Sequence, residues 1–366
     1  MIVDAGAALL WLVVTVYALT GGADFGGGMW DLLAGGSRRG ARARWLIARA
    51  IGPVWESNHV WLVIILVLLW TGFPQAFGAI MSTLFAPLSI AAFGIILRGS
   101  AFALRQVAHS LRYQRLTGAF FALSSLLTPF FFGAAAGAVV TGRVPASGAG
   151  NRLAIWTTPT ALTLGAISVV AFAYLAAVYL TYEARRMEPN LVTYFARRAL
   201  VSGVAVGALA GLALFELKTS APRIVDRLTQ GVGLPFLVGS FVLGIAVLAG
   251  LVAGPTHWLR YMSAGAFAAM LWGWAVAQYP AILPGSLSIY AAAAPTGSLV
   301  SEFVVVGVIA VVVLPSFLLL FRLSQHGLLS DEETTEQFLA NLSEDDTEIS
   351  DQLTLGDGGR KEDLGQ

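Results

Sequence analysis

Long apolar segments recur along the whole chain, and they constrain its fold more than any other feature. A helix that crosses a membrane needs about 20 mostly apolar residues. Reading between charged, proline and glycine breaks gives nine such segments: 5–23, 55–71, 77–97, 117–140, 158–181, 198–216, 234–254, 258–279 and 302–322. Backbone polar groups in lipid must be satisfied within the segment, so each is predicted to be a helix. The sequence therefore predicts an all-α integral membrane protein with about nine transmembrane helices.

The composition agrees with this class. The 366 residues are 57% hydrophobic and only 12% charged, whereas soluble domains carry about 25% charged residues. The first apolar segment lacks a preceding basic region and a small-residue cleavage pattern, so we interpret it as a retained helix rather than a signal peptide. The absence of cysteine excludes disulfides, thiolate chemistry and cysteine-ligated iron–sulfur clusters.

Basic residues predict the orientation of these helices. Fifteen lie in or beside the loops after the first, third, fifth and seventh segments and after the last, against five in the other loops. Arg98 is counted here as the edge of the loop after the third segment. By the positive-inside rule, the N-terminus is outside and the C-terminus cytoplasmic. Because the arginines follow membrane edges rather than a soluble face, nucleic-acid binding has no support.

The C-terminal segment differs in composition. Twelve of the 21 acidic residues lie from Asp331 onwards, where aromatic residues are few. Such a segment cannot bury enough apolar surface to fold. We therefore predict a transmembrane domain over 1–323 and an acidic, disordered cytoplasmic tail over 324–366.

Two carboxylates fall at the predicted cytoplasmic edge of the membrane. Asp24 lies in the glycine-rich segment 21–28 that ends the first helix, and Glu56 lies at the start of the second, in Gly-Pro-Val-Trp-Glu-Ser-Asn-His-Val-Trp. Ionisable groups at membrane depth are costly and are by default functional. The pair therefore favours a proton path that opens on the cytoplasm. The alternatives are a Glu56 that satisfies the first amides of its helix and an Asp24 that serves packing or a turn.

Neighbours of Glu56 are predicted to support it. Glu56 and His59 are three residues apart and share a helix face, as do Asn58 and Trp61; Trp55 precedes them. Haem ligation by His59 is disfavoured, because no second histidine lies one turn away on its helix. We expect His59 to be a polar neighbour of Glu56 and expect no metal site. Glu302 is interpreted as a helix cap or a charge at the level of the lipid headgroups.

Three stretches resemble subunit II of the cytochrome bd quinol oxidases. Gly-Ala-Asp24-Phe-Gly-Gly-Gly-Met is similar to that family's Gly-Phe-Asp-Phe-Gly motif, although Ala23 replaces its aromatic residue. The segment 52–62 is similar to its Pro-x-Trp-Asp/Glu-x-Asn-Gln/His-Val-Trp-Leu signature. The stretch from Tyr279 to Pro295 resembles the loop before its last helix. The resemblance extends over about 1–322.

The resemblance implies a heterodimer in the bacterial cytoplasmic (inner) membrane that oxidises quinol and reduces O2 to water, generating a proton motive force. The partner, subunit I, is expected to carry two haem b and one haem d. This chain is expected to bind no cofactor directly, to stabilise subunit I, and to contribute a proton path through Glu56 with Asp24. Trp55, Asn58, His59 and Trp61 are expected to shape that path. Other expected contacts are membrane lipid and a possible small accessory subunit.

Two other functions are compatible with the same residues. A proton-coupled secondary transporter could use both acids, but transporters place site acids at the midplane on broken helices. A purely structural subunit would need neither acid for proton transfer.

Overall fold

The computed structural model describes residues 1–35, 39–105, 111–254 and 257–325. Within α2, the side chains of residues 52–57 are also outside the described part of the chain. The predicted acidic tail falls almost entirely outside it, from residue 326 onwards. The tail and the domain boundary at residues 323 and 324 therefore stay predictions.

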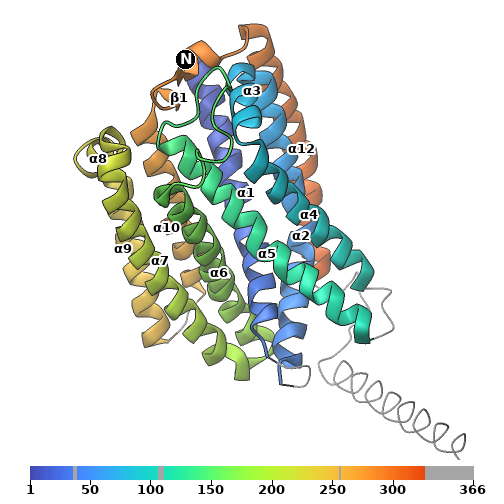
Figure 1. Cartoon of the computed structure of the whole chain (residues 1–366). Helices are drawn as coiled ribbons and strands as arrows, with labels where there is room; N and C mark the ends of the chain where they lie inside the picture. Colours follow the sequence, from blue (N-terminus) through green and yellow to red (C-terminus); the bar gives the residue numbers. More distant parts are fainter. Residues whose placement is uncertain (36–38, 106–110, 255–256, 326–366) are drawn as a thin grey trace, which may run out of the picture.

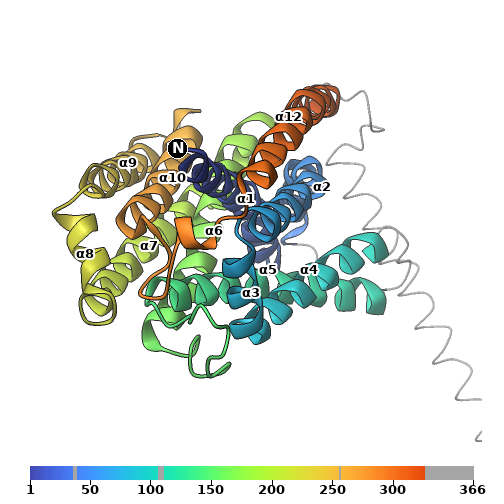
Figure 2. The same ribbon diagram turned by 90° about the horizontal axis from the view of Figure 1, so that it is seen from above.

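Long helices dominate the architecture, as the apolar segments predict. In the described part of the chain, nine helices have 20 residues or more: α1 (Ile2–Leu32), α2 (Ala41–Gly72), α4 (Phe85–Arg105), α5 (Leu111–Val140), α6 (Pro159–Met187), α7 (Val192–Ser220), α9 (Leu234–Ala253), α10 (Trp258–Gln278) and α12 (Thr296–Gln325). They run side by side along one common direction (Figure 1). Seen from above, α1 and α6 lie near the middle, with α7 to α10 on one side and α2, α4 and α12 on the other (Figure 2). The all-α fold class is confirmed.

Short elements connect the long helices. They are α3 (Pro74–Thr83), the 3-10 helix η1 (Pro189–Leu191), α8 (Pro222–Thr229), α11 (Ile289–Ala292), and the antiparallel strands β1 (Ala281–Leu283) and β2 (Leu287–Ser288). The two strands form a small hairpin within the segment that precedes α12. They lie near the chain's N-terminus at one end of the bundle (Figure 1).

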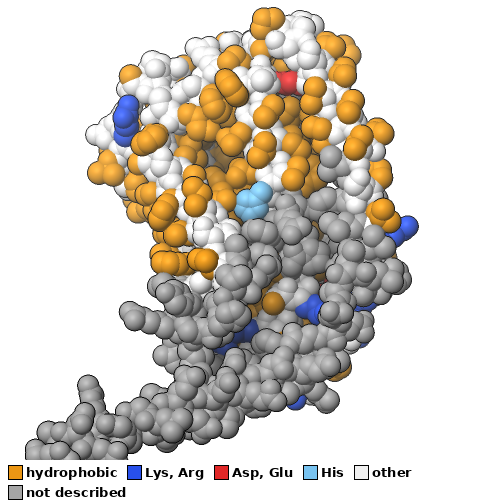
Figure 3. All heavy atoms as spheres, turned by 90° about the vertical axis from the view of Figure 1, so that its right-hand side faces the viewer, with side chains coloured by type: hydrophobic (Ala, Val, Ile, Leu, Met, Phe, Trp, Pro, Cys, Tyr) orange, Lys and Arg blue, Asp and Glu red, His pale blue; other side chains and the backbone are white. Residues whose placement is uncertain are grey.

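Only some of the described helices are clearly long and apolar enough to cross a membrane. By length and composition, five of the described helices could cross a membrane, or up to six if one bent pair counts as a single span. Two further helices, Phe85–Ala101 and Thr296–Val312, are apolar but shorter over their described residues. The face formed by α12, α2 and α4 is mostly hydrophobic wherever its side chains are described (Figure 3). The chain thus has the character of a multi-pass membrane protein, whereas nine spans stay a prediction.

The third predicted segment, 77–97, is not one continuous helix. α3 ends at Thr83 and α4 begins at Phe85, with the buried Leu84 at the break. A second break precedes α3, where its axis bends by 118° from the second half of α2. This bend follows from Pro74, which disfavours helical backbone at Phe73 and opens the new helix at its first position. The break at Leu84 is signalled by Pro87 in the first turn of α4, which cannot donate a backbone hydrogen bond to Thr83; hydropathy alone missed it.

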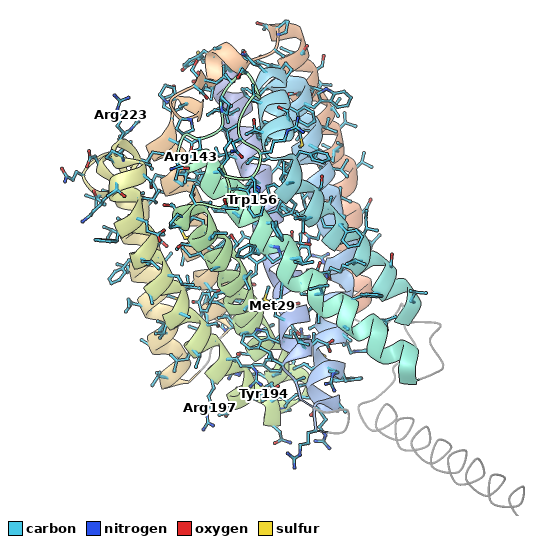
Figure 4. All side chains as sticks on the ribbon, viewed as in Figure 1. Met29, Arg143, Trp156, Tyr194, Arg197 and Arg223 are labelled. Atoms are coloured by element: carbon cyan, nitrogen blue, oxygen red, sulfur yellow. The ribbon has the colours of Figure 1, made fainter. Side chains whose placement is uncertain are left out.

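The two groups of predicted loops lie at opposite ends of the bundle. Figure 4 shows Arg143 and Arg223 toward the end that carries the N-terminus, and Arg197 at the other end. This separation agrees with the alternation of loops expected from the sequence. Which end faces the cytoplasm stays a prediction.

Tyrosines attach the segment before α12 to the N-terminus. The hydroxyls of Tyr279 and Tyr290 donate hydrogen bonds to Oδ1 of Asp4, at 3.0 and 2.6 Å. The Met1 ammonium contacts the other carboxylate oxygen at 2.9 Å. Asp4 thus joins three parts of the chain at this end of the bundle.

Close backbone contact between α1 and α6 depends on Gly26. A Cβ atom at this position would lie 2.0 Å from the carbonyl oxygen of Phe172, closer than any non-bonded contact allows. Small residues commonly permit such approach between membrane helices. Phe25, next to Gly26, is buried in a core cluster with Phe172, Leu46 and Phe195. The middle of the bundle is therefore packed around this contact.

We predict that Gly26→Ala destabilises the protein, because α1 and α6 must move apart to admit the methyl group. Overpacking of this kind costs about 1–3 kcal/mol. The matched control is Gly207→Ala in α7, where a Cβ meets nothing within 4 Å. Thermal unfolding of the purified protein in detergent should show a lower midpoint for Gly26→Ala and an unchanged or higher one for Gly207→Ala. Equal midpoints for the two variants would contradict the close contact.

Candidate functional site

A buried ion pair joins α1 to α4. Asp24 in α1 and Arg98 in α4 both have fully buried side chains. The guanidinium of Arg98 donates from Nη2 to Oδ1 of Asp24 at 2.5 Å and from Nε to Oδ2 at 3.3 Å. Nη2 also donates to the backbone oxygen of Asp24 at 2.8 Å. Both carboxylate oxygens of Asp24 are therefore engaged by one arginine, whose charge balances that of Asp24.

A hydroxyl group and two aromatic rings also contact the guanidinium of Arg98. Nη1 donates to the hydroxyl of Ser125 in α5 at 2.6 Å. The guanidinium also lies 4.1 Å from the ring centre of Phe121 and 4.9 Å from that of Phe25, which are cation–π distances. Removing one partner of such a buried pair costs about 3–5 kcal/mol, because the other charge is left uncompensated.

Gly28 makes room for this arrangement. A Cβ atom there would lie 2.1 Å from Oγ of Ser125 and 2.8 Å from Nη1 of Arg98. The glycines around Asp24 thus do more than let helices approach each other. At Gly28, the missing side chain leaves space for the polar groups that neutralise Asp24.

Asn58 belongs to α2 and packs on α1 beside Thr20 and Gly21, which are close to Asp24 in the sequence. Its side chain is fully buried, and its Oδ1 accepts a hydrogen bond from Thr20 at 2.9 Å. A Cβ atom at Gly21 would lie 3.2 Å from its Nδ2, so the amide packs directly on α1. Nδ2 of Asn58 has no hydrogen-bond partner among the described residues, and neither has the hydroxyl of the buried Tyr17. Among the described residues, two polar groups without partners therefore lie near Asp24 on α1 and α2.

Glu56 lies inside a helix rather than at its start. α2 begins at Ala41, 15 residues earlier, or about 22 Å along the axis at 1.5 Å per residue. The alternative that Glu56 satisfies the first amides of its helix is therefore wrong. The sequence placed the helix start too late because the arginines before Gly52 interrupt the apolar run, although they do not interrupt the helix.

The other predicted site residues share α2 with Glu56. His59 and Trp61 are half-buried, and Trp61 packs against a core cluster that includes Ile64 and Leu68. The side chains of Trp55 and Glu56 lie outside the described residues. The structure therefore brings Asn58 to the face of α1 that carries Asp24, while the position of the Glu56 carboxylate relative to Asp24 stays a prediction.

Arg98 is the residue that sequence reasoning missed. It was counted with the loop after the third segment because its charge ended the apolar run at Leu97. The structure continues α4 to Arg105 and buries Arg98 completely. Apolar residues continue on both sides of it, and a lone arginine in such a run needs a buried partner. That signal could have paired Arg98 with Asp24.

Glu302 also differs from its prediction as a cap or headgroup-level charge. Its side chain is buried, and it accepts a short hydrogen bond from the hydroxyl of Thr71 in α2. A Cβ atom at Gly72 would lie 2.7 Å from its Oε2. Glu302 thus joins α12 to the end of α2. Within the described residues, no group of three or more His, Asp or Glu side chains could hold a metal ion.

Comparisons with known proteins address the family of this chain. Residues 4–324 match the family model described as cytochrome bd terminal oxidase subunit II. A segment of 129 residues is 27% identical to cytochrome bd ubiquinol oxidase subunit 2 of Bacillus subtilis (strain 168), covering 34% of this chain and 37% of that protein. The matched segment thus spans about a third of this curated relative.

A solved structure gives the same fold. A chain of the bd oxidase from Geobacillus thermodenitrificans superposes with a TM-score of 0.74 at 23% identity, covering 88% of this chain and 98% of that one. The resemblance seen in the motifs around Asp24 and Glu56 is confirmed by a match over nearly all of the described residues. This chain therefore belongs to the family of cytochrome bd terminal oxidase subunit II.

Proposed function

We propose that this chain is the non-haem subunit of a cytochrome bd-type oxidase, which oxidises membrane quinol and reduces O2 to water in the bacterial inner membrane. The observation that carries the proposal is the family match over residues 4–324. The bd oxidase fold supports it. The haem groups, two b and one d, are assigned to a partner subunit I, which this chain stabilises. Release of quinol protons outside and uptake of protons from the cytoplasm would generate a proton motive force.

Within this function, we assign proton delivery to Glu56. The residue lies in an unbroken helix, two positions before the buried Asn58. Asn58 packs on α1 beside Gly21, one turn before Asp24. A proton that enters at Glu56 would thus reach the polar face of α1, which carries Thr20 and Asp24. Trp55, His59 and Trp61 would shape the entrance.

In this proposal Asp24 positions α1 rather than transferring the proton itself. Both of its carboxylate oxygens are engaged by Arg98, which also binds Ser125. This arrangement fixes α1 against α4 and α5 beside the proposed path. Asp24 therefore assists proton delivery by holding the polar face of α1 in place.

The transporter alternative has less support. Transporters bind their substrates and coupling ions at interruptions of helices, whereas α1 is continuous through Asp24 and α2 is continuous through Glu56. No observation on the described residues favours it over the oxidase. A purely structural role for the chain is separated from the proposal by the variants below.

The partner assignment predicts a haem-bearing complex. Expressing this chain with a neighbouring gene for a haem-bearing membrane subunit should yield a stable complex with b- and d-type absorbance and quinol-dependent oxygen uptake. Expression of the neighbour alone should lower the haem yield. Purification of this chain without any haem-bearing partner, together with activity as a transporter, would contradict the proposal.

We predict that Glu56→Gln lowers quinol-dependent oxygen uptake by at least about tenfold while the haem absorbance stays unchanged. Removing a group that transfers protons costs about 10²–10⁴-fold in rate, and a parallel route would reduce that loss. The matched control is Glu216→Gln in α7, whose carboxylate accepts a hydrogen bond from Thr163 that glutamine can replace. Unchanged oxygen and proton uptake in Glu56→Gln would leave the chain with a structural role only.

The ion pair predicts non-additive effects of substitution. Arg98→Met should lower the unfolding midpoint strongly, because an uncompensated buried charge costs about 3–5 kcal/mol. The double variant Asp24→Asn with Arg98→Met removes both charges and should regain much of the stability and of the oxygen uptake. A double variant that is stable but inactive would instead assign proton transfer to the Asp24 carboxylate itself.

A further inference from the structure

The first turn of α10 gathers cationic and aromatic side chains at one end of the bundle. Arg260 lies two residues after the first residue of the helix. Its guanidinium lies 3.9 Å from the ring centre of Tyr182 in α6 and 4.6 Å from that of Tyr261. Two tyrosine rings from different helices thus hold one guanidinium in place.

The hydrogen-bonding capacity of Arg260 is largely unused. Nη2 donates to the hydroxyl of Tyr261 at 2.5 Å, and Nε is buried without a partner, out of reach of an external anion. Nη1 has no hydrogen-bond partner among the described residues and is not buried. Among the described residues, no carboxylate lies within 4.0 Å of this guanidinium. A planar guanidinium can bind a phosphate through two parallel hydrogen bonds. Arg260 is therefore a fixed cation with donors available for an anion.

One carboxylate lies near this arginine, but it does not neutralise the cluster. Glu183 is buried in α6, where Arg186 contacts it at 4.0 Å. Arg260 also interacts with Glu183 electrostatically, beyond salt-bridge distance. Two arginines therefore surround one buried carboxylate, which leaves a net positive charge. The N-terminus of α10 adds to that positive potential.

Exposed aromatic side chains surround this cluster in a pattern typical of a membrane surface. Trp258 is 62% exposed and Tyr261 55% exposed, and their rings lie 6.2 Å apart. Tryptophan and tyrosine are enriched where apolar lipid meets water. The neighbouring surface of α9 is apolar. Its exposed side chains include Phe241, Val242, Ile245 and Val252.

We propose that Arg260, Tyr182, Tyr261 and Trp258 form a binding site for the phosphodiester headgroup of an anionic phospholipid. The phosphate oxygens accept hydrogen bonds from Nη1 and Nη2 of Arg260, and Arg186 contributes long-range attraction. The aromatic rings contact the glycerol region, and the acyl chains extend along the exposed face of α9. A soluble phosphate would gain only the first of these contacts. This inference does not depend on the roles proposed for Glu56 and Asp24.

The test compares lipids that share chain composition but differ in headgroup charge. The delipidated purified complex would be titrated with dioleoyl phosphatidylglycerol or dioleoyl phosphatidylcholine, and retained lipid counted by native mass spectrometry. We expect at least a fivefold preference for phosphatidylglycerol at one site, weakened by salt. Glycerol 3-phosphate should not compete at millimolar concentration. Competition by glycerol 3-phosphate would replace the lipid with a soluble anion, and equal retention of both lipids would overturn the proposal.

Two substitutions locate the site. Arg260→Gln should remove the preference, while Arg197→Gln at the same end of the bundle should keep it; the exposed Arg197 serves as the charge-matched control. If Arg260→Gln does not yield a folded complex, Trp258→Ala removes an exposed ring and should weaken retention at least threefold. Full retention in a folded Arg260→Gln variant, or in Trp258→Ala, would contradict the assignment.

Discussion

The ion pair between Asp24 and Arg98 is the constraint on which the middle of this bundle depends. Both side chains are fully buried, so each charge must be compensated by the other. The pair joins α1 to α4, and Ser125 extends the contact to α5. Small residues on α1 permit this arrangement, because Gly28 leaves space for Arg98 and Ser125 while Gly26 lets α6 approach closely. The glycine-rich motif and the buried arginine therefore form one structural unit.

The continuous helix α2 connects Glu56 to this unit, because its Asn58 packs on α1. The helix runs without a break from Ala41 to Gly72, and its side chain at Asn58 packs on α1 beside Gly21. Glu56 consequently lies well inside α2 rather than at its start. The bend at Phe73 ends the helix at the opposite end, where Glu302 and Thr71 join it to α12. Polar contacts thus fix α2 near both ends of the apolar stretch.

The two ends of the bundle differ in chemistry. At the end that carries the N-terminus, Tyr279 and Tyr290 bind Asp4, and this polar contact is satisfied within the chain. At the other end, Arg260 and Arg198 stack on tyrosines and retain buried Nε atoms without partners. Tyrosines therefore hold a carboxylate at one end of the bundle and arginines at the other.

Sequence alone determined the all-α class, the approximate positions of most long helices and the family, because hydropathy and short motifs are local properties. It also singled out the carboxylates of Asp24 and Glu56, with Asn58 as a supporting neighbour. It could not determine that Arg98, 74 residues from Asp24, would be its partner, since pairing across helices depends on packing. It placed the start of the helix around Glu56 too late and missed the break at Leu84, because hydropathy alone does not define where a helix begins or ends. Only the tertiary structure decided which charges are buried together, since burial is a property of several helices at once.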